Sequence, residues 1–174
     1  MFKIEKLVVG FLDENCYIVS NNNDALIIDP GDEGERIISF IKEHSYNVKA
    51  ILITHYHFDH IGALEKIKNE FKVDVIDYNN QNKVDGFDYQ IIENNGHTLD
   101  CVSYYFKKEK VMFTGDFIFK ETIGNYKEEN YKFMLESLTK FKNGNYNGVI
   151  IYPGHGDNTT YDYEIKNNPF LKGL

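Results

Sequence analysis

Three histidines and an aspartate stand within six positions of the run THYHFDH: His55, His57, Asp59 and His60. Imidazole and carboxylate groups are the side chains that bind zinc and similar divalent ions. An apolar segment precedes the run and a segment with helical periodicity follows it. Asp59 and His60 fall at the expected helix start, so they are expected to point in different directions, toward two adjacent ions. A solvated polar loop is the alternative interpretation of this run taken alone.

The sequence has three further histidines outside this run. His97 follows Gly96 in NNGHTLD, and His155 stands between two glycines in YPGHGDNTT. Both come just after an expected strand, and glycine lets the backbone approach an ion closely. We therefore add His97 and His155 to the candidate ligands, although a single histidine of this kind is usually an ordinary polar residue. His44 lies on an expected helix and is interpreted as a surface residue without a role.

Two aspartates follow apolar strands in the same way. Asp116 comes after Gly115 at the end of the run 110–114, and Asp29 ends the run 25–29 before Pro30. Two divalent ions about 3.5–4 Å apart need an anionic bridge, and Asp116 is the best-placed remaining carboxylate. Asp29 is interpreted as the acceptor for the second nitrogen of a ligand histidine. A turn or a helix cap is the alternative for each.

Alternating apolar patterns predict the elements that position these residues. Strands are expected over 2–9, 15–20, 25–29, 48–54, 73–77, 88–93, 101–107, 110–114 and 148–152. Helices are expected over 33–45, 61–71 and 128–141, the first with Asp32 as its N-cap. Hairpin-like pairs mixed with strand–helix units favour a layered α/β sandwich over a doubly wound sheet. No linker or repeat divides the chain, so a single domain, residues 1–174, is expected.

Composition excludes some partners. The net charge is −8 with a pI of about 5.2, which argues against nucleic acid or an anionic membrane as the partner. No apolar stretch reaches the roughly 20 residues of a membrane-spanning helix, and the N-terminus does not resemble a secretory signal, so a cytoplasmic location is expected. Arg36 is the only arginine. Cys16 and Cys101 form no CxxC pair and are interpreted as reduced packing residues, with a role for Cys101 at the rim of the site as the alternative.

The motifs THYHFDHIG, GHT, TGD and YPGHG occur in an order and spacing that resemble the metallo-β-lactamase-fold hydrolases. Within them, the stretches NCYIV and IIDPGD and the tail TTYDYEIKNNPFL are similar to the small glyoxalase II-like (hydroxyacylglutathione hydrolase-like) group. The resemblance implies a four-layer αββα sandwich with two divalent metal ions, with zinc expected and iron or manganese as alternatives. It also implies that one ion is held by His55, His57 and His97, and the other by Asp59, His60 and His155, with Asp116 bridging both.

Two features depart from the glyoxalase II pattern. Full-length glyoxalase II has an additional C-terminal helical domain that contributes to glutathione binding, and 174 residues leave no room for it. Within the loop 120–130, the stretch TIGNYKEEN stands where small relatives have a stretch like SIGR, so an arginine is missing there. The acyl group, the thiol partner, the native metal and the oligomeric state therefore stay open.

The expected reaction is the hydrolysis of a small-molecule thioester or ester by a hydroxide that bridges the two ions. Asp59 is the expected catalytic residue, which orients the nucleophile and assists proton transfer. A mononuclear iron oxidoreductase similar to the persulfide dioxygenases of this fold is one alternative, and a non-catalytic binding member is another. The seven intact candidate ligands favour the hydrolase.

Overall fold

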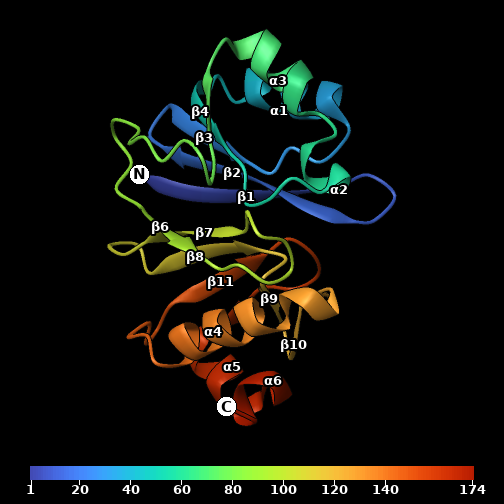
Figure 1. The fold of residues 1–174 in the computed structure, drawn as a ribbon. Helices are drawn as coiled ribbons and strands as arrows, with labels where there is room; N and C mark the ends of the chain where they lie inside the picture. The colour runs from blue at the N-terminus through green and yellow to red at the C-terminus, as the bar shows by residue number, and fades with distance from the viewer. The chain divides into compact units, whose positions relative to one another are not determined.

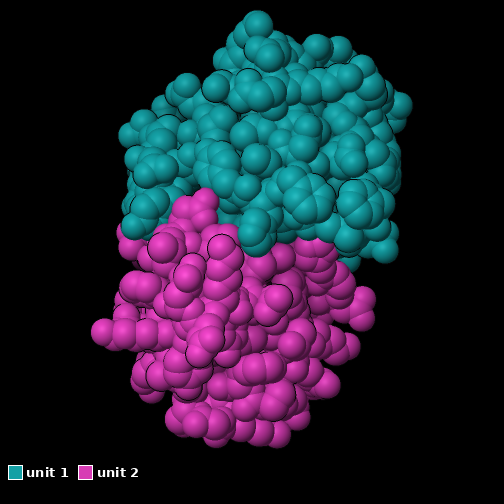
Figure 2. Space-filling view, turned by 45° about the vertical axis from the view of Figure 1, so that its right-hand side comes forward, with its two compact units in different colours: residues 1–88 teal, residues 89–174 magenta.

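The computed structural model describes residues 1–174, which form two compact units, 1–88 and 89–174 (Figure 2). Each unit contains a five-stranded sheet with helices packed on it (Figure 1). No helix of the chain is both long enough and apolar enough to cross a lipid bilayer.

The sheet of the first unit has the strand order β1-β2-β3-β4-β5. Its strands are β1 (Phe2–Val9), β2 (Glu14–Asn21), β3 (Asp24–Ile28), β4 (Asn47–Leu52) and β5 (Asp74–Ile76). The first three pair antiparallel, whereas β3, β4 and β5 run parallel. Because parallel neighbours end at the same edge, the residues after β3 and those after β4 lie side by side there.

Three helices complete the first unit: α1 (Gly34–Glu43), α2 (Phe58–Ile61) and α3 (Leu64–Phe71). Three isoleucines at helical spacing give α1 an apolar face, and Leu64 and Ile67 give one to α3. Both faces pack on the sheet in the core that contains Ile27 and Ile51. Burial of these side chains anchors both ends of the segment 53–63, which carries the histidine run.

The sheet of the second unit has the order β12-β11-β8-β7-β6. Its strands are β6 (Gln90–Glu93), β7 (Val102–Phe106), β8 (Val111–Gly115), β11 (Ile150–Pro153) and β12 (Thr159–Thr160), and a separate hairpin is formed by β9 (Ile118–Phe119) and β10 (Thr122–Ile123). Strands β8 and β11 are parallel, and Gly154 N donates to Gly115 O at 2.9 Å just past their ends. The residues that follow these strands, Asp116 and His155, are thereby brought together.

The helices of the second unit are η1 (Glu128–Asn130), α4 (Tyr131–Lys142), α5 (Tyr161–Asn167) and α6 (Pro169–Lys172). Met134, Leu138 and Phe141 recur at helical spacing on α4 and pack into a core with Met112 and Ile151 of the sheet. This core holds the sheet edge at which Asp116 and His155 emerge.

All nine strands predicted from the sequence are present, with ends shifted by one or two residues. The two-residue strands β9, β10 and β12 and the short helices α5 and α6 were not predicted, because elements of that length have no periodicity to detect.

The helix expected over 61–71 is interrupted. Residues 58–61 form α2 and α3 begins only at Leu64, because Ala63 N donates to Pro30 O at 3.0 Å and so holds the chain against the loop after β3. The prediction of Asp32 as the N-cap of the first helix is wrong. Glu33, in a left-handed conformation, is the N-cap, and Asp32 Oδ1 accepts from Glu33 N at 2.6 Å instead.

Candidate metal centre

His55 and His57 direct ring nitrogens at each other in the first unit. His55 Nε2 lies 3.2 Å from His57 Nδ1, and the two rings are inclined at 76°. Two donors bound to one zinc ion at about 2.1 Å with tetrahedral geometry lie about 3.4 Å apart. The predicted pair is therefore brought together, at a distance within hydrogen-bonding range and close to that of two ligands on one ion.

Asp29 orients two histidine rings, that of His60 directly and that of His55 through Thr54. Asp29 Oδ1 accepts from Thr54 N at 2.7 Å, and Asp29 Oδ2 accepts from Thr54 Oγ1 at 2.6 Å and from His60 Nδ1 at 3.0 Å. Since the single hydroxyl proton of Thr54 is donated to Asp29, its oxygen accepts from His55 Nδ1 at 3.1 Å. The Nδ1 atoms of His55 and His60 thus carry the protons, and both Nε2 atoms keep a lone pair for a cation.

His60 also faces Asp59 and a further carboxylate. His60 Nε2 lies 4.0 Å from Asp59 Oδ2, whereas His60 Nδ1 lies 3.7 Å from Glu14 Oε1. Glu14 is buried on β2. The lone pair of His60 is therefore on the side of Asp59, as the predicted ligand pair requires, and two buried carboxylates lie on its protonated side.

The backbone around Asp59 is fixed by close contact with the loop after β3, which contains Asp29, Pro30 and Gly31. A Cβ on Gly31 would lie 1.8 Å from Asp59 O, and a Cβ on Gly62 would lie 2.2 Å from Gly31 O. Only glycine fits at either position, because any side chain would displace α2 and with it the Asp59 carboxylate.

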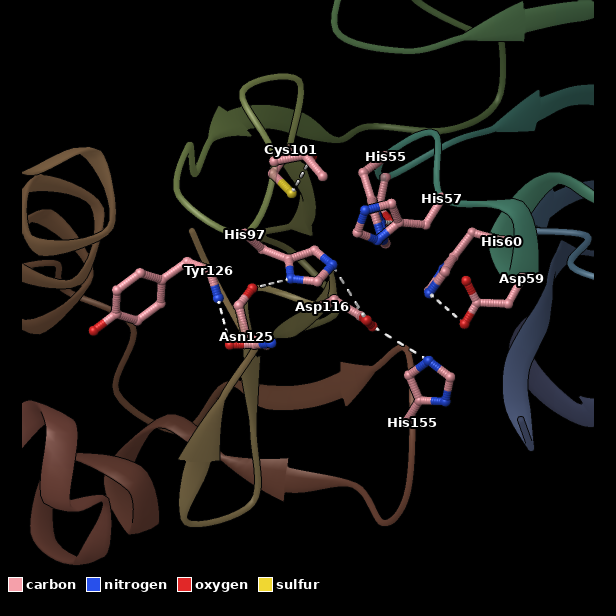
Figure 3. A network of polar contacts seen from close by, with 12 residues as sticks. His55, His57, Asp59, His60, His97, Cys101, Asp116, Asn125, Tyr126 and His155 are labelled. Atoms are coloured by element: carbon pink, nitrogen blue, oxygen red, sulfur yellow. Dashed lines mark hydrogen bonds and ion pairs between the residues drawn. The ribbon is translucent and has the colours of Figure 1, made fainter. Parts of the chain in front are cut away.

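Asp116 meets one histidine with each of its oxygens in the second unit. Asp116 Oδ2 lies 3.6 Å from His97 Nε2, and Asp116 Oδ1 lies 3.6 Å from His155 Nε2 (Figure 3). These distances are too long for hydrogen bonds, which span about 2.7–3.2 Å, but close to the separation of two donors on one ion. Each oxygen of Asp116 therefore faces a different histidine.

The loop that departs from the family pattern holds His97 in one tautomer. His97 Nδ1 contacts the carbonyl oxygen of Asn125, which only accepts, so Nδ1 carries the proton and Nε2 presents its lone pair toward Asp116 (Figure 3). A Cβ on Gly124 would lie 1.8 Å from Asp116 O and 3.1 Å from His97 Nδ1. Glycine at 124 is therefore what allows this loop to reach both residues.

A comparison of the chain with protein families matches the Metallo-beta-lactamase superfamily over residues 9–80 and 78–155. The chain belongs to this superfamily. A relative named hydroxyacylglutathione hydrolase GloC, from Haemophilus influenzae, is 31% identical, and the match covers 97% of each chain.

Two solved structures of the superfamily are similar over nearly their whole length. The BLEG-1 B3 metallo-beta-lactamase has a TM-score of 0.90 at 27% identity, covering 98% of this chain and 100% of that one. TTHA1623 in a di-iron-bound form has a TM-score of 0.84 at 26% identity, covering 96% and 100%. These matches confirm the predicted fold class, the αββα sandwich of the metallo-β-lactamase type, and show a metallo-hydrolase of this fold with His/Asp clusters for divalent metal.

The sequence also singled out His44, Cys16 and Cys101, which are not among the candidate ligands. His44 is at the surface at the end of α1, where its ring stacks on Phe40. Burial raises the pKa of the Cys101 thiol to about 12, and burial beside Glu14 and Asp29 raises the pKa of the Cys16 thiol well above its usual value. Both cysteines are buried and free, in agreement with their interpretation as reduced packing residues.

Sequence reasoning missed three residues that support the candidate ligands: Glu14, Thr54 and Asn125. Thr54 directly precedes the histidine run, and a hydroxyl next to a ligand histidine was an available signal. Glu14 had none, because a glutamate at the start of a strand is ordinarily solvated. Asn125 acts through its backbone carbonyl, which no side-chain pattern encodes.

An apolar pocket borders Asp59 in the first unit. It encloses about 250 Å³ and is lined by Val9, Gly10, Phe11, Leu12, Gly31, Asp32, Phe58, Asp59 and Gly62. Phe11 and Phe58 stack at 6.2 Å and are 81% and 63% exposed. Phe58 thus shapes a pocket, whereas Tyr56 instead donates its hydroxyl to Asp77.

Proposed function

We propose that the two ligand clusters form one dinuclear centre that hydrolyses a small-molecule thioester or ester. One ion is held by His55, His57 and His97, and the other by Asp59, His60 and His155. Asp116 bridges them. Zinc is the proposed metal, with iron or manganese as alternatives. Residues 1–174 act as one domain in this proposal, and the cytoplasmic location stays a prediction.

The observation that carries the proposal is the position of Asp116. Its two oxygens each lie 3.6 Å from the Nε2 atom of a different histidine, and the Nδ1 proton of His97 is donated away from the carboxylate, to Asn125 O. A carboxylate held for hydrogen bonding or for a single ion pair would draw both oxygens toward donors at shorter range. This arrangement supports one ion on each side of Asp116.

Two bound divalent ions supply a nucleophile at neutral pH, by lowering the pKa of water, and an electrophile for the carbonyl oxygen. The chain's own residues hold these ions and position the substrate. Asp59 combines a ligand position facing His60 with a place on the wall of the apolar pocket, so it orients the attacking group and receives its proton. Phe11 and Phe58 supply the aromatic part of that pocket wall.

The named relative supports the thioester substrate, and the di-iron form of TTHA1623 supports a two-metal centre. The test is metal content per chain, measured by mass spectrometry on protein purified without chelators, followed by assays with a thioester panel. About two equivalents of metal and thioester turnover are expected. One equivalent of iron together with oxygen uptake on persulfides would favour the dioxygenase alternative. A metal-loaded protein that turns over neither kind of substrate would favour the non-catalytic binding protein.

A further inference from the structure

The second unit has an open groove of about 860 Å³ beside the candidate ligands. The groove is bordered by β10, the loop after it, η1, the start of α4, and α6. Its size is within the range of small-molecule sites, about 300–1,000 Å³. We call it the unit 2 groove. Its lining residues are Ile123, Gly124, Asn125, Tyr126, Glu128, Tyr131 and Phe170.

The unit 2 groove is in direct contact with two candidate ligands. Asn125 O accepts from His97 Nδ1, and the backbone at Gly124 lies against Asp116 O. Only the backbone of Gly124 and Asn125 therefore separates a molecule in the groove from His97 and Asp116, two of the proposed metal ligands.

The seven lining residues include three aromatic side chains and no lysine or arginine. Tyr126 and Tyr131 lie with ring centroids 6.2 Å apart, and Phe170 on α6 is 42% exposed. Glu128 is the one charged residue among the seven that line it. The single arginine of the chain, Arg36, belongs to the first unit, where it donates to Glu33 Oε2 at 2.9 Å and to Val8 O at 2.8 Å.

Anionic groups bind where arginine or lysine faces them, whereas aromatic surfaces bind apolar groups. We propose that the unit 2 groove binds an uncharged aromatic or alkyl group of the substrate, and that it discriminates against groups that carry carboxylates. This inference rests on the proposed function and narrows its substrate class. It predicts that a glutathione thioester is a poor substrate and that a thioester of an uncharged thiol is a good one.

The experiment compares two thioethers that are not hydrolysed and share a benzyl group: S-benzyl-N-acetylcysteamine, which is uncharged, and S-benzylglutathione, which carries two carboxylates. Calorimetry on the metal-loaded full chain measures both dissociation constants. We expect the uncharged ligand to bind at least about fivefold more tightly, and Tyr131→Ala to weaken its binding. Equal or tighter binding of S-benzylglutathione, no binding of either ligand, or no effect of Tyr131→Ala would overturn the proposal.

A matched pair of charge reversals separates the groove from the overall charge of −8. Glu128 lines the groove, whereas its neighbour Glu129 is exposed and does not line it. Glu128→Lys is expected to improve S-benzylglutathione binding about three- to tenfold relative to the uncharged ligand, and Glu129→Lys by less than about twofold. Equal effects of both variants would assign the discrimination to the net charge of the protein and overturn the proposal that the groove causes it.

Turnover of the acetyl thioesters of the same two thiols, N-acetylcysteamine and glutathione, distinguishes this inference from the proposed function. If neither thioester is hydrolysed by the metal-loaded protein, the thioesterase proposal fails. The binding of the two thioethers still tests whether the groove prefers an uncharged group. If both are hydrolysed and the glutathione thioester is preferred, the thioesterase stands and the groove inference fails.

Discussion

Asp29 Oδ2 accepts hydrogen bonds from both His60 Nδ1, at 3.0 Å, and Thr54 Oγ1, at 2.6 Å. Through Thr54 the same carboxylate also determines which nitrogen of His55 carries its proton. One buried residue after β3 therefore orients two candidate ligands from the segment after β4. This was the role predicted for Asp29 from the sequence, extended to a second histidine.

Replacement of Asp29 by asparagine should weaken metal binding without unfolding the chain. Asparagine tolerates the left-handed backbone at this position, where φ is 49°. Its amide would present a donor to His60 Nδ1 and Thr54 Oγ1, which favours the wrong tautomers. Metal affinity should fall about 10- to 100-fold, measured by chelator competition. Asp74→Asn, an exposed carboxylate on β5, is the control, and an unchanged affinity in Asp29→Asn would contradict this role.

Loss of Asp116, the proposed bridge, or of His57, a proposed ligand, should abolish activity. Asp116→Ala and His57→Ala are each expected to lower kcat/KM about 10³-fold or more, which corresponds to about 4 kcal/mol of transition-state stabilisation. Bound metal should fall with it, and the far-ultraviolet circular dichroism should stay unchanged. His44→Ala removes a surface histidine and serves as the control. Full activity in a variant depleted of metal would refute the two-metal mechanism.

Removal of metal should also lower thermal stability. A ligand present at about 100 times its dissociation constant stabilises the folded state by about 2.7 kcal/mol. For a chain of this size that corresponds to a Tm decrease of roughly 5–10 °C after chelation. Calorimetry before and after dialysis against a chelator, with zinc added back, measures the change. A Tm that does not respond to either step would mean that the folded state binds no metal.

Glu164 on α5 should be a stability residue rather than a site residue. Its buried carboxylate accepts from Thr159 Oγ1 at 2.5 Å, Glu121 N at 2.9 Å and Asn168 Nδ2 at 2.9 Å. In Glu164→Gln the amide group replaces one acceptor with a donor, so the free energy of unfolding should fall by about 2–4 kcal/mol. Urea titration measures it. Glu136→Gln, exposed on α4, should change stability by less than about 1 kcal/mol.

The two cysteines should resist alkylation in the folded protein. With the pKa of Cys101 raised to about 12 and that of Cys16 raised well above its usual value, almost no thiolate exists at pH 8. Iodoacetamide labelling, followed by mass spectrometry, should be about 10³-fold slower than for a free thiol and should reach both cysteines after denaturation. Rapid labelling of Cys101 in the native state would revive its role at the site rim.

The sequence alone predicted nine of the twelve strands and named the candidate ligands, because both depend on local patterns. A buried strand alternates or concentrates apolar residues, and the run His55-x-His57-x-Asp59-His60 has few explanations other than metal binding. The candidates lie shortly after strand ends, which made them recognisable in the sequence. That Asp116 and His155 belong to one site was implied by the family resemblance, and the parallel pairing of β8 with β11 was seen only in the structure.

Only the tertiary structure decided how these ligands are held. The tautomers of His55 and His60 depend on Asp29 and Thr54, which come from different strands, and that of His97 depends on the carbonyl of Asn125, 28 residues away. The interruption between α2 and α3 arises from a hydrogen bond to Pro30 O. Such contacts join segments that are distant in the chain, and local periodicity carries no record of them, because they form only when the sheets bring strand ends together.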